Sequence, residues 1–174
     1  SAAHYCTNPQ CFAAEREGMI HFASRKGFDI SGLGDKIISK LIEEGLVSDK
    51  ADIFELTEGD LRPLERFAEK SASKLVASIS KSRKISFPRF LFSLGIRHIG
   101  EETAYLIESN IQLLGIDVRK REISLADIVR VFPEIDSETW RNIPGIGEKA
   151  GESLSLWFRD SRHLNSLRKM SQLG

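Results

Sequence analysis

The sequence predicts an all-α fold. Apolar residues recur every three or four positions over most of the chain, few segments alternate with a period of two, and glycine or proline separates short blocks. The 174 residues are 41% hydrophobic and 29% charged, which indicates a folded chain with an apolar core rather than a disordered one. No apolar run approaches the roughly eighteen residues that a membrane-spanning helix needs.

The periodicity predicts eight helices. We expect Gly45 to end the second of them and Ser124 to be the N-cap of the sixth, because glycine and serine are favoured at those positions. The predicted helices are 14–25, 34–44, 68–82, 87–94, 100–109, 124–132, 147–159 and 161–172. Residues 1–13 stand apart as a short cysteine turn between Cys6 and Cys11. Two cysteines are too few for a disulfide-stapled fold, so we expect a cytoplasmic protein.

An internal repeat is the most informative pattern in the chain. When Gly34, Ala68, Gly100 and Gly147 are aligned, apolar residues stand four positions before, one position before and seven positions after each of them. An acidic residue follows each one directly. The pattern predicts four helix-hairpin-helix repeats, arranged as two pairs, within a domain of residues 14–174. The repeats lie near residues 30–45, 64–80, 94–109 and 141–158.

The repeated unit, apolar-x-Gly-apolar-Gly before a helix, has a physical interpretation. Two glycines around one apolar residue permit positive φ and close backbone approach, so the chain can bend tightly between two helices. The central apolar residue would enter the core. The second glycine would open the next helix, whose first backbone N–H groups have no intrahelical partner and form a phosphate-binding site.

Lysine recurs two positions after the aligned residue, as Lys36, Lys70 and Lys149, whereas the third repeat has Glu102. A lysine in the first helical turn opposes the helix dipole at a cost of a few tenths to about 1 kcal/mol. A bound polyanion would explain why three repeats accept this cost. The alternative is a long side chain that extends into solvent.

Charge is distributed unevenly along the chain. The net charge is zero, with 25 basic and 25 acidic residues, and this balance alone argues against a nucleic-acid-binding protein. Residues 70–100, however, contain seven Lys or Arg and no carboxylate. This segment is either an anion-binding surface or an ordinary solvated basic face.

Other functional motifs fit the chain poorly. Residues 145–150 match a dinucleotide-binding G-x-G-x-x-A pattern, but the polar, proline-ended segment before them does not predict the required strand. Gly95–Gly100 has the spacing of a P-loop, but acidic residues stand where lysine and serine are needed. The four histidines are scattered, and we expect no catalytic residue in this chain. The phenylalanines at 87, 90 and 92 are expected in the core.

Cys6 and Cys11 have the spacing of half a structural zinc site. Zinc normally takes four ligands, and a second cysteine pair is absent from this sequence. His4 is the nearest further donor. The two residues are therefore either the end of a zinc finger or two free thiols.

Several motifs, in this order, resemble one family. They are Cys6-Thr7-Asn8-Pro9-Gln10-Cys11, Glu15-Arg16, Ile20-His21-Phe22-Ala23-Ser24-Arg25-Lys26, Ile30-Ser31-Gly32-Leu33-Gly34, residues 64–72 (LERFAEKSA) and residues 89–100 (RFLFSLGIRHIG). Together they are similar to the C-terminal half of bacterial NAD-dependent DNA ligases, where the end of a zinc finger precedes four helix-hairpin-helix motifs. The similarity extends over nearly the whole chain.

The resemblance implies a parent enzyme that seals 5′-phosphate/3′-hydroxyl nicks in duplex DNA during replication and repair. In that family NAD supplies an adenylyl group to a lysine in an N-terminal domain, and the parent uses magnesium and zinc. That domain is not in this sequence, so we expect no cofactor and no ligation by this chain alone. It would bind nicked duplex DNA near the bacterial nucleoid, beside the remaining ligase domains.

The resemblance also implies the residues that contact phosphate. They are Gly32, Gly34, Lys36, Arg66, Ala68, Lys70, Arg97, His98, Gly100, Gly145, Gly147 and Lys149. Ala68 stands where the family usually has glycine, which weakens the expectation of close backbone approach in the second repeat. Cys6 and Cys11 would be the zinc ligands.

Three alternatives remain open to different degrees. A base-excision glycosylase has one such hairpin and a catalytic aspartate, but the only candidate, Asp160, has too little chain behind it for a base pocket. A protein-interaction platform could use the acidic blocks around 43–60 and 101–138. Another DNA-repair protein with similar hairpins would not explain the cysteine turn.

Overall fold

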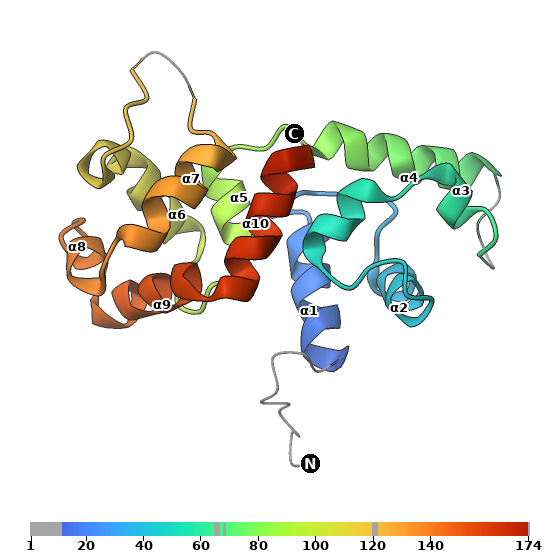
Figure 1. Cartoon of the computed structure of the whole chain (residues 1–174), viewed down its shortest axis with the longest axis horizontal. Coiled ribbons are helices and arrows are strands. Elements are labelled where there is room, and N and C mark those ends of the chain that lie inside the picture. Colours follow the sequence, from blue (N-terminus) through green and yellow to red (C-terminus); the bar gives the residue numbers. More distant parts are fainter. Residues whose placement is uncertain (1–11, 65–66, 68, 120–121, 174) are drawn as a thin grey trace. The chain divides into compact units, whose positions relative to one another are not determined.

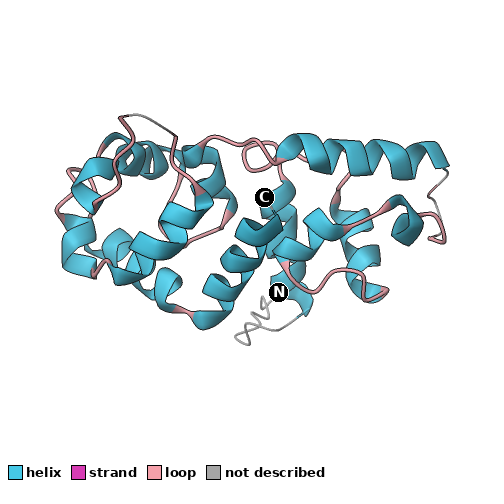
Figure 2. Ribbon diagram, turned by 45° about the horizontal axis from the view of Figure 1, so that its top comes forward, coloured by secondary structure: helices cyan, strands magenta, loops and turns pink. Residues whose placement is uncertain are grey.

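The computed structural model describes residues 12–64, 67, 69–119 and 122–173 (Figure 1). Within these ranges the chain is helical and contains no strand (Figure 2), which confirms the predicted all-α class. The chain divides into two compact units, Ser1–Lys84 and Ile85–Gly174.

The helices of the first unit are α1 (Phe12–Ala23), α2 (Asp35–Glu43), the 3₁₀ helix η1 (Lys50–Glu55), α3 (Glu58–Leu61) and α4 (Glu69–Ser82). Those of the second unit are α5 (Phe87–Ser93), α6 (Glu101–Ser109), η2 (Ile111–Leu114), α7 (Leu125–Val131), η3 (Phe132–Glu134), α8 (Ser137–Arg141), α9 (Glu148–Arg159) and α10 (Ser161–Leu173).

The core of the first unit forms between α1, α2 and the segments that follow them. The buried faces of the two helices contribute Met19, Phe22, Ala23, Ile38 and Leu41. Three phenylalanine rings extend this core, with centroids 4.3 Å apart for Phe22 and Phe28 and 5.3 Å apart for Phe28 and Phe54. Aromatic pairs at such distances add to the stabilisation that burial provides.

An aromatic cluster forms the core of the second unit. Phe132 meets Trp140 and Phe158 edge to face at 5.1 and 5.0 Å, and all three side chains are fully buried. Helices α8 and α9 cross closely: a Cβ built at Gly151 would lie 3.0 Å from the Ser137 carbonyl oxygen. Gly151 therefore permits this helix crossing.

The structure confirms both helix-end predictions. Ser124 is the N-cap of α7 and forms a capping box with Asp127, in which each side chain accepts a hydrogen bond from the other residue's backbone N–H. Gly45 follows α2 with φ of 72°, and its N–H donates to the Ile42 carbonyl. Left-handed glycine is a common way to end a helix.

All eight predicted helices are present, with ends that differ by two residues or fewer. The sequence did not predict η1, α3, η2, η3 and α8, which are short. Helix α8 occupies the stretch before Gly145 where a dinucleotide site needs a strand, so the rejection of that motif is confirmed. The segment between α6 and α7 buries Ile111, Leu114 and Ile116.

None of the helices in the described ranges combines the length and the apolar character that crossing a lipid bilayer demands.

Candidate nucleic-acid interface

The same backbone hydrogen bond recurs next to all four aligned positions. The residue before each aligned position donates its backbone N–H to the carbonyl oxygen three residues earlier. These bonds join Leu33 to Ile30, Phe67 to Leu64, Ile99 to Ile96 and Ile146 to Ile143, at 3.2, 3.2, 3.1 and 3.1 Å. We call the bends hairpins 1 to 4. Arg66 and Ala68 lie outside the described residues, so hairpin 2 is described only in part.

Three apolar side chains anchor each of hairpins 1, 3 and 4 in a core. The residues of the three aligned apolar columns are all buried there: Ile30, Leu33 and Leu41; Ile96, Ile99 and Ile107; Ile143, Ile146 and Leu154. In hairpin 2, Leu75 is buried, whereas Leu64 and Phe67 are half-buried. The polar and glycine positions of hairpins 1, 3 and 4 are exposed as a result.

The first glycine position of the hairpin has a left-handed backbone. Its φ is 89° at Gly32, 93° at Gly145 and 69° at His98. Glycine adopts this conformation without steric cost, whereas an L-residue pays roughly 1–2 kcal/mol. His98 is therefore strained. Hairpin 3 nevertheless has the same left-handed backbone at this position as hairpins 1 and 4, which have glycine there.

The second glycine position has a different reason for its residue type. Gly34, Gly100 and Gly147 are the N-caps of α2, α6 and α9, with φ between −84° and −98°, which any residue can adopt. A Cβ built at any of the three has no heavy atom within 4 Å. Neither backbone conformation nor packing within the protein requires glycine here.

These three glycines also leave their helices without a side-chain cap. Elsewhere in the described chain, Asp49, Thr57, Ser124 and Asp136 accept a backbone N–H at the start of a helix. Serine at an N-cap is at least as stabilising as glycine, because its hydroxyl accepts one of the free N–H groups. The hairpins thus present helix starts without an N-cap side chain, which an external anion can approach. At α2, the Asp35 carboxylate already accepts one of the first N–H groups, that of Lys36.

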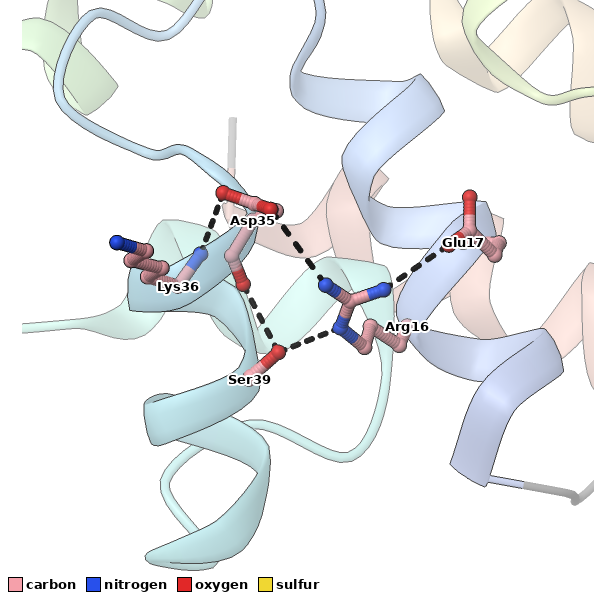
Figure 3. Close-up of polar contacts among 5 residues, drawn as sticks. All are labelled: Arg16, Glu17, Asp35, Lys36 and Ser39. Atoms are coloured by element: carbon pink, nitrogen blue, oxygen red, sulfur yellow. Dashed lines mark hydrogen bonds and ion pairs between the residues drawn. The ribbon is translucent and has the colours of Figure 1, made fainter.

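Hairpin 1 has a polar network at the start of α2 (Figure 3). The Lys36 backbone N–H donates to Asp35 Oδ1 at 2.9 Å. Arg16 of α1 lies beside this turn, with Nη2 at 3.6 Å from Asp35 Oδ2, and its Nε donates to Ser39 Oγ. Arg16 also pairs with Glu17 at 2.9 Å. The sequence did not predict Arg16 as part of this site, because no motif links it to Asp35, 19 positions further along the chain.

Within each unit, one hairpin lies against the second helix of the other repeat. A Cβ built at Gly32 would be 3.7 Å from Leu75 of α4, and one at Gly145 would be 2.7 Å from Leu106 of α6. Hairpins 1 and 2 therefore belong to one core, and hairpins 3 and 4 to the other.

The other predicted phosphate contacts are at the surface where they are described. Lys36, Lys70, Lys149, Arg97 and His98 all have exposed side chains. The predicted zinc ligands, Cys6 and Cys11, lie outside the described residues. In the described ranges, no three His, Cys, Asp or Glu side chains come together as a metal site.

Asp160, the candidate nucleophile of the glycosylase alternative, has a structural environment. Its carboxylate accepts hydrogen bonds from Arg162 Nη2 at 2.9 Å and from the Arg162 backbone N–H at 2.9 Å. The Arg162 side chain is the main reason that the pKa of Asp160 falls to about 2. The carboxylate connects the end of α9 to the start of α10.

Comparison with known proteins identifies the family. No family model matches the chain. The chain is 38% identical to the DNA ligase of Pelotomaculum thermopropionicum over 99% of its own length and 23% of that protein. It is 36% identical to the DNA ligase of Bacillus subtilis over 97% of its length and 23% of that protein.

The DNA ligase of Alkalilimnicola ehrlichii is 43% identical over 77% of the chain and 20% of that protein. The chain thus spans less than a quarter of the length of each of these relatives. The matches to the Pelotomaculum thermopropionicum and Bacillus subtilis proteins extend over 97% or more of the chain, a range that includes all four hairpins. The chain belongs to the DNA ligase family, as a segment of its longer members.

Proposed function

We propose that this chain binds duplex DNA around nicks, without sequence preference, as the non-catalytic C-terminal region of an NAD-dependent DNA ligase. Hairpins 1 to 4 would each place a helix start against a backbone phosphate. Contacts of this kind fix the protein on the duplex but carry no sequence information.

The observation that carries the proposal is the second glycine of the hairpin. A Cβ at Gly34, Gly100 or Gly147 would point into open space, and the three helices that begin there have no hydrogen bond from an N-cap side chain. A phosphate oxygen that approaches the first backbone N–H groups of the helix needs both conditions. Exposed Lys36 and Lys149 stand two positions further on and would add charge to the same phosphates.

The parent enzyme would supply the chemistry. In this proposal, adenylyl transfer from NAD, the divalent metal and the sealing of the nick belong to other domains, which are outside this sequence. Cys6 and Cys11 would complete a zinc site with ligands from that neighbouring sequence. The described residues contribute binding and orientation of the DNA, close to the chromosome.

Titration of labelled nicked duplex tests the proposal. We expect the 174-residue chain to bind two duplexes of unrelated sequence with equal affinity, and the affinity to fall steeply between 50 and 200 mM salt. Each phosphate contact contributes about −0.9 to the slope of log affinity against log salt concentration. Binding that is absent at 50 mM salt, or that does not change with salt, would contradict the proposal.

A charge reversal separates DNA binding from a protein-interaction platform. The variant Lys36→Glu/Lys149→Glu should bind duplex at least tenfold more weakly, because two phosphate contacts become repulsive. The matched control is Arg119→Glu/Arg168→Glu, which makes the same charge change at two exposed positions outside the four repeats. Equal affinities for the two variants would favour the platform.

A further inference from the structure

Three lysines form a line along the outer face of α4. Lys70, Lys74 and Lys81 are all exposed, and Ala77 between them is exposed too. At 100° per residue, the three lysines fall within about 40° of one another around the helix, and all four positions fall within about 60°. With a rise of 1.5 Å per residue, the line is about 16 Å long. We call these three residues the α4 lysine stripe.

The stripe lies opposite the buried face of the helix. That face consists of Ala72, Leu75, Ile79 and Ser82. Since the centres of the two faces are about 140° apart on the helix, the ammonium groups project away from the core of the first unit. The stripe begins at Lys70, in the first turn after hairpin 2, so it continues the proposed DNA-binding surface.

The stripe is electrostatically unfavourable in the chain by itself. Like charges four residues apart, as at Lys70 and Lys74, destabilise a helix by about 0.2–0.5 kcal/mol. Residues 70–100 contain no carboxylate. No ion pair joins Lys70, Lys74 or Lys81 to the described part of the chain, although Lys40 of α2 pairs with Glu44 at 3.1 Å and Arg62 with Glu58 at 2.8 Å. The repulsion is thus uncompensated within the described chain.

We propose that the α4 lysine stripe is a second DNA-backbone contact, which binds phosphates of the duplex beyond the one held at hairpin 2. This inference rests on the proposed function. A line of about 16 Å is long enough to meet two or three successive phosphates, because lysine side chains are flexible. The contact requires only charge and reach, so it is independent of DNA sequence.

The test uses Lys74→Gln/Lys81→Gln, which leaves Lys70 and the hairpins unchanged. Binding of the 174-residue chain to labelled nicked duplex is measured from 50 to 200 mM salt. Loss of two phosphate contacts should reduce the salt slope by about 1.8, so that over this range the variant loses about 12-fold less affinity than the wild type. The control, Arg119→Gln/Arg168→Gln, removes the same charge at two exposed positions outside the four repeats and should keep the wild-type slope.

Further variants distinguish failure of the stripe from failure of the proposed function. If Gly34→Ser/Gly147→Ser weakens binding but Lys74→Gln/Lys81→Gln has the wild-type slope, the stripe proposal is overturned and the hairpin proposal stands. If the wild type does not bind duplex at all, both are overturned. Binding of the wild type and of Lys74→Gln/Lys81→Gln to polyglutamate, a model of an acidic protein, is measured as well. If the variant binds polyglutamate more weakly than the wild type but binds duplex equally well, the stripe binds an acidic protein, and the proposal of a DNA contact is wrong.

Discussion

The glycines of the hairpins serve two separate needs. Gly32 and Gly145 have positive φ, which the bend itself requires. Gly34, Gly100 and Gly147 have an ordinary backbone with open space around Cα, and the fold makes no demand on them. Substitution at the first kind therefore tests the fold, whereas substitution at the second kind tests binding.

Gly147→Ser should weaken DNA binding without weakening the fold. The serine hydroxyl can accept a free backbone N–H of α9, which leaves the free energy of unfolding unchanged or higher by a few tenths of a kcal/mol. The added Cβ and hydroxyl occupy the place of the phosphate oxygen, so we expect about a tenfold loss of affinity, since hydrogen bonds to charged groups contribute roughly 1.5–3 kcal/mol each. Urea denaturation and duplex titration measure the two quantities.

Ser124→Ala is the matched control for Gly147→Ser. It removes a side-chain cap from α7, away from the hairpins, and should lower the free energy of unfolding by about 1 kcal/mol while DNA affinity stays the same. A Gly147→Ser chain that is less stable and binds DNA normally would contradict our interpretation of the open glycines.

His98→Gly should stabilise the chain. His98 has φ of 69° at the position where hairpins 1 and 4 have glycine. Release of this strain favours the folded state by roughly 1–2 kcal/mol, and the greater freedom of glycine in the unfolded chain offsets about half of that. We expect the free energy of unfolding to rise by about 0.5–1 kcal/mol in urea denaturation. A decrease would show that the His98 side chain stabilises hairpin 3.

At the scale of elements, helices of seven or more residues could be predicted because several turns of one buried face repeat the apolar spacing. Helices α3 and α8 have four and five residues, which is too short for a recurring pattern. Their N-caps, Thr57 and Asp136, were the only local signal. The hairpins could be predicted because the same spacing of apolar residues around the aligned position recurs four times in the sequence.

The site contains contacts that no sequence pattern encodes. Arg16 reaches the start of α2 only because α1 and α2 pack together, so it needs the tertiary structure. The open space at Gly34 and Gly147 likewise depends on what the rest of the chain leaves uncovered. Sequence spacing predicted where the hairpins are, and the fold determines which of their atoms are accessible.

Lys50 of η1 lies over the ring of Phe22 in α1. Its lowered pKa should make the free energy of unfolding depend on pH. Burial lowers its pKa to about 8, although the neighbouring Asp49 carboxylate raises it. Its Nζ lies 5.8 Å from the Phe22 ring centroid. Between pH 8 and 10.5 the unfolded chain binds this proton and the folded chain does not, so the free energy of unfolding should rise with pH over that range.

The test of this prediction is Lys50→Met, which keeps the long aliphatic stem and removes the charge. At pH 7 the variant should be more stable by about 1–3 kcal/mol, since one pKa unit corresponds to about 1.4 kcal/mol. Its stability should also lose most of the rise between pH 8 and 10.5. Urea denaturation at pH 7, 8, 9 and 10 measures both effects, and identical pH profiles for the variant and the wild type would contradict the role of Lys50.

At the scale of the whole molecule, each unit has its own core. Phe22 is buried in the first unit and Trp140 in the second, and each side chain is fully buried. Chains with more than one core commonly unfold in more than one step. The division at Lys84 therefore bears on thermal stability as well as on function.

We expect calorimetry to resolve two unfolding transitions. Trp140→Ala should lower the midpoint of one transition and Phe22→Ala that of the other, because loss of a large buried aromatic side chain costs about 3–5 kcal/mol in its own core. A single transition that both variants lower equally would show that the two units unfold as one.

Two of the aligned hairpins depart from the glycine pattern: the second has Ala68 and the third has His98. Contacts of one kind, distributed over a chain, multiply their individual affinities, so a defect in one reduces residence time without abolishing attachment. Dissociation can likewise proceed contact by contact, with a small barrier at each step. Under the proposed function, such gradual release would let the bound chain leave one stretch of duplex without breaking all of its phosphate contacts at once.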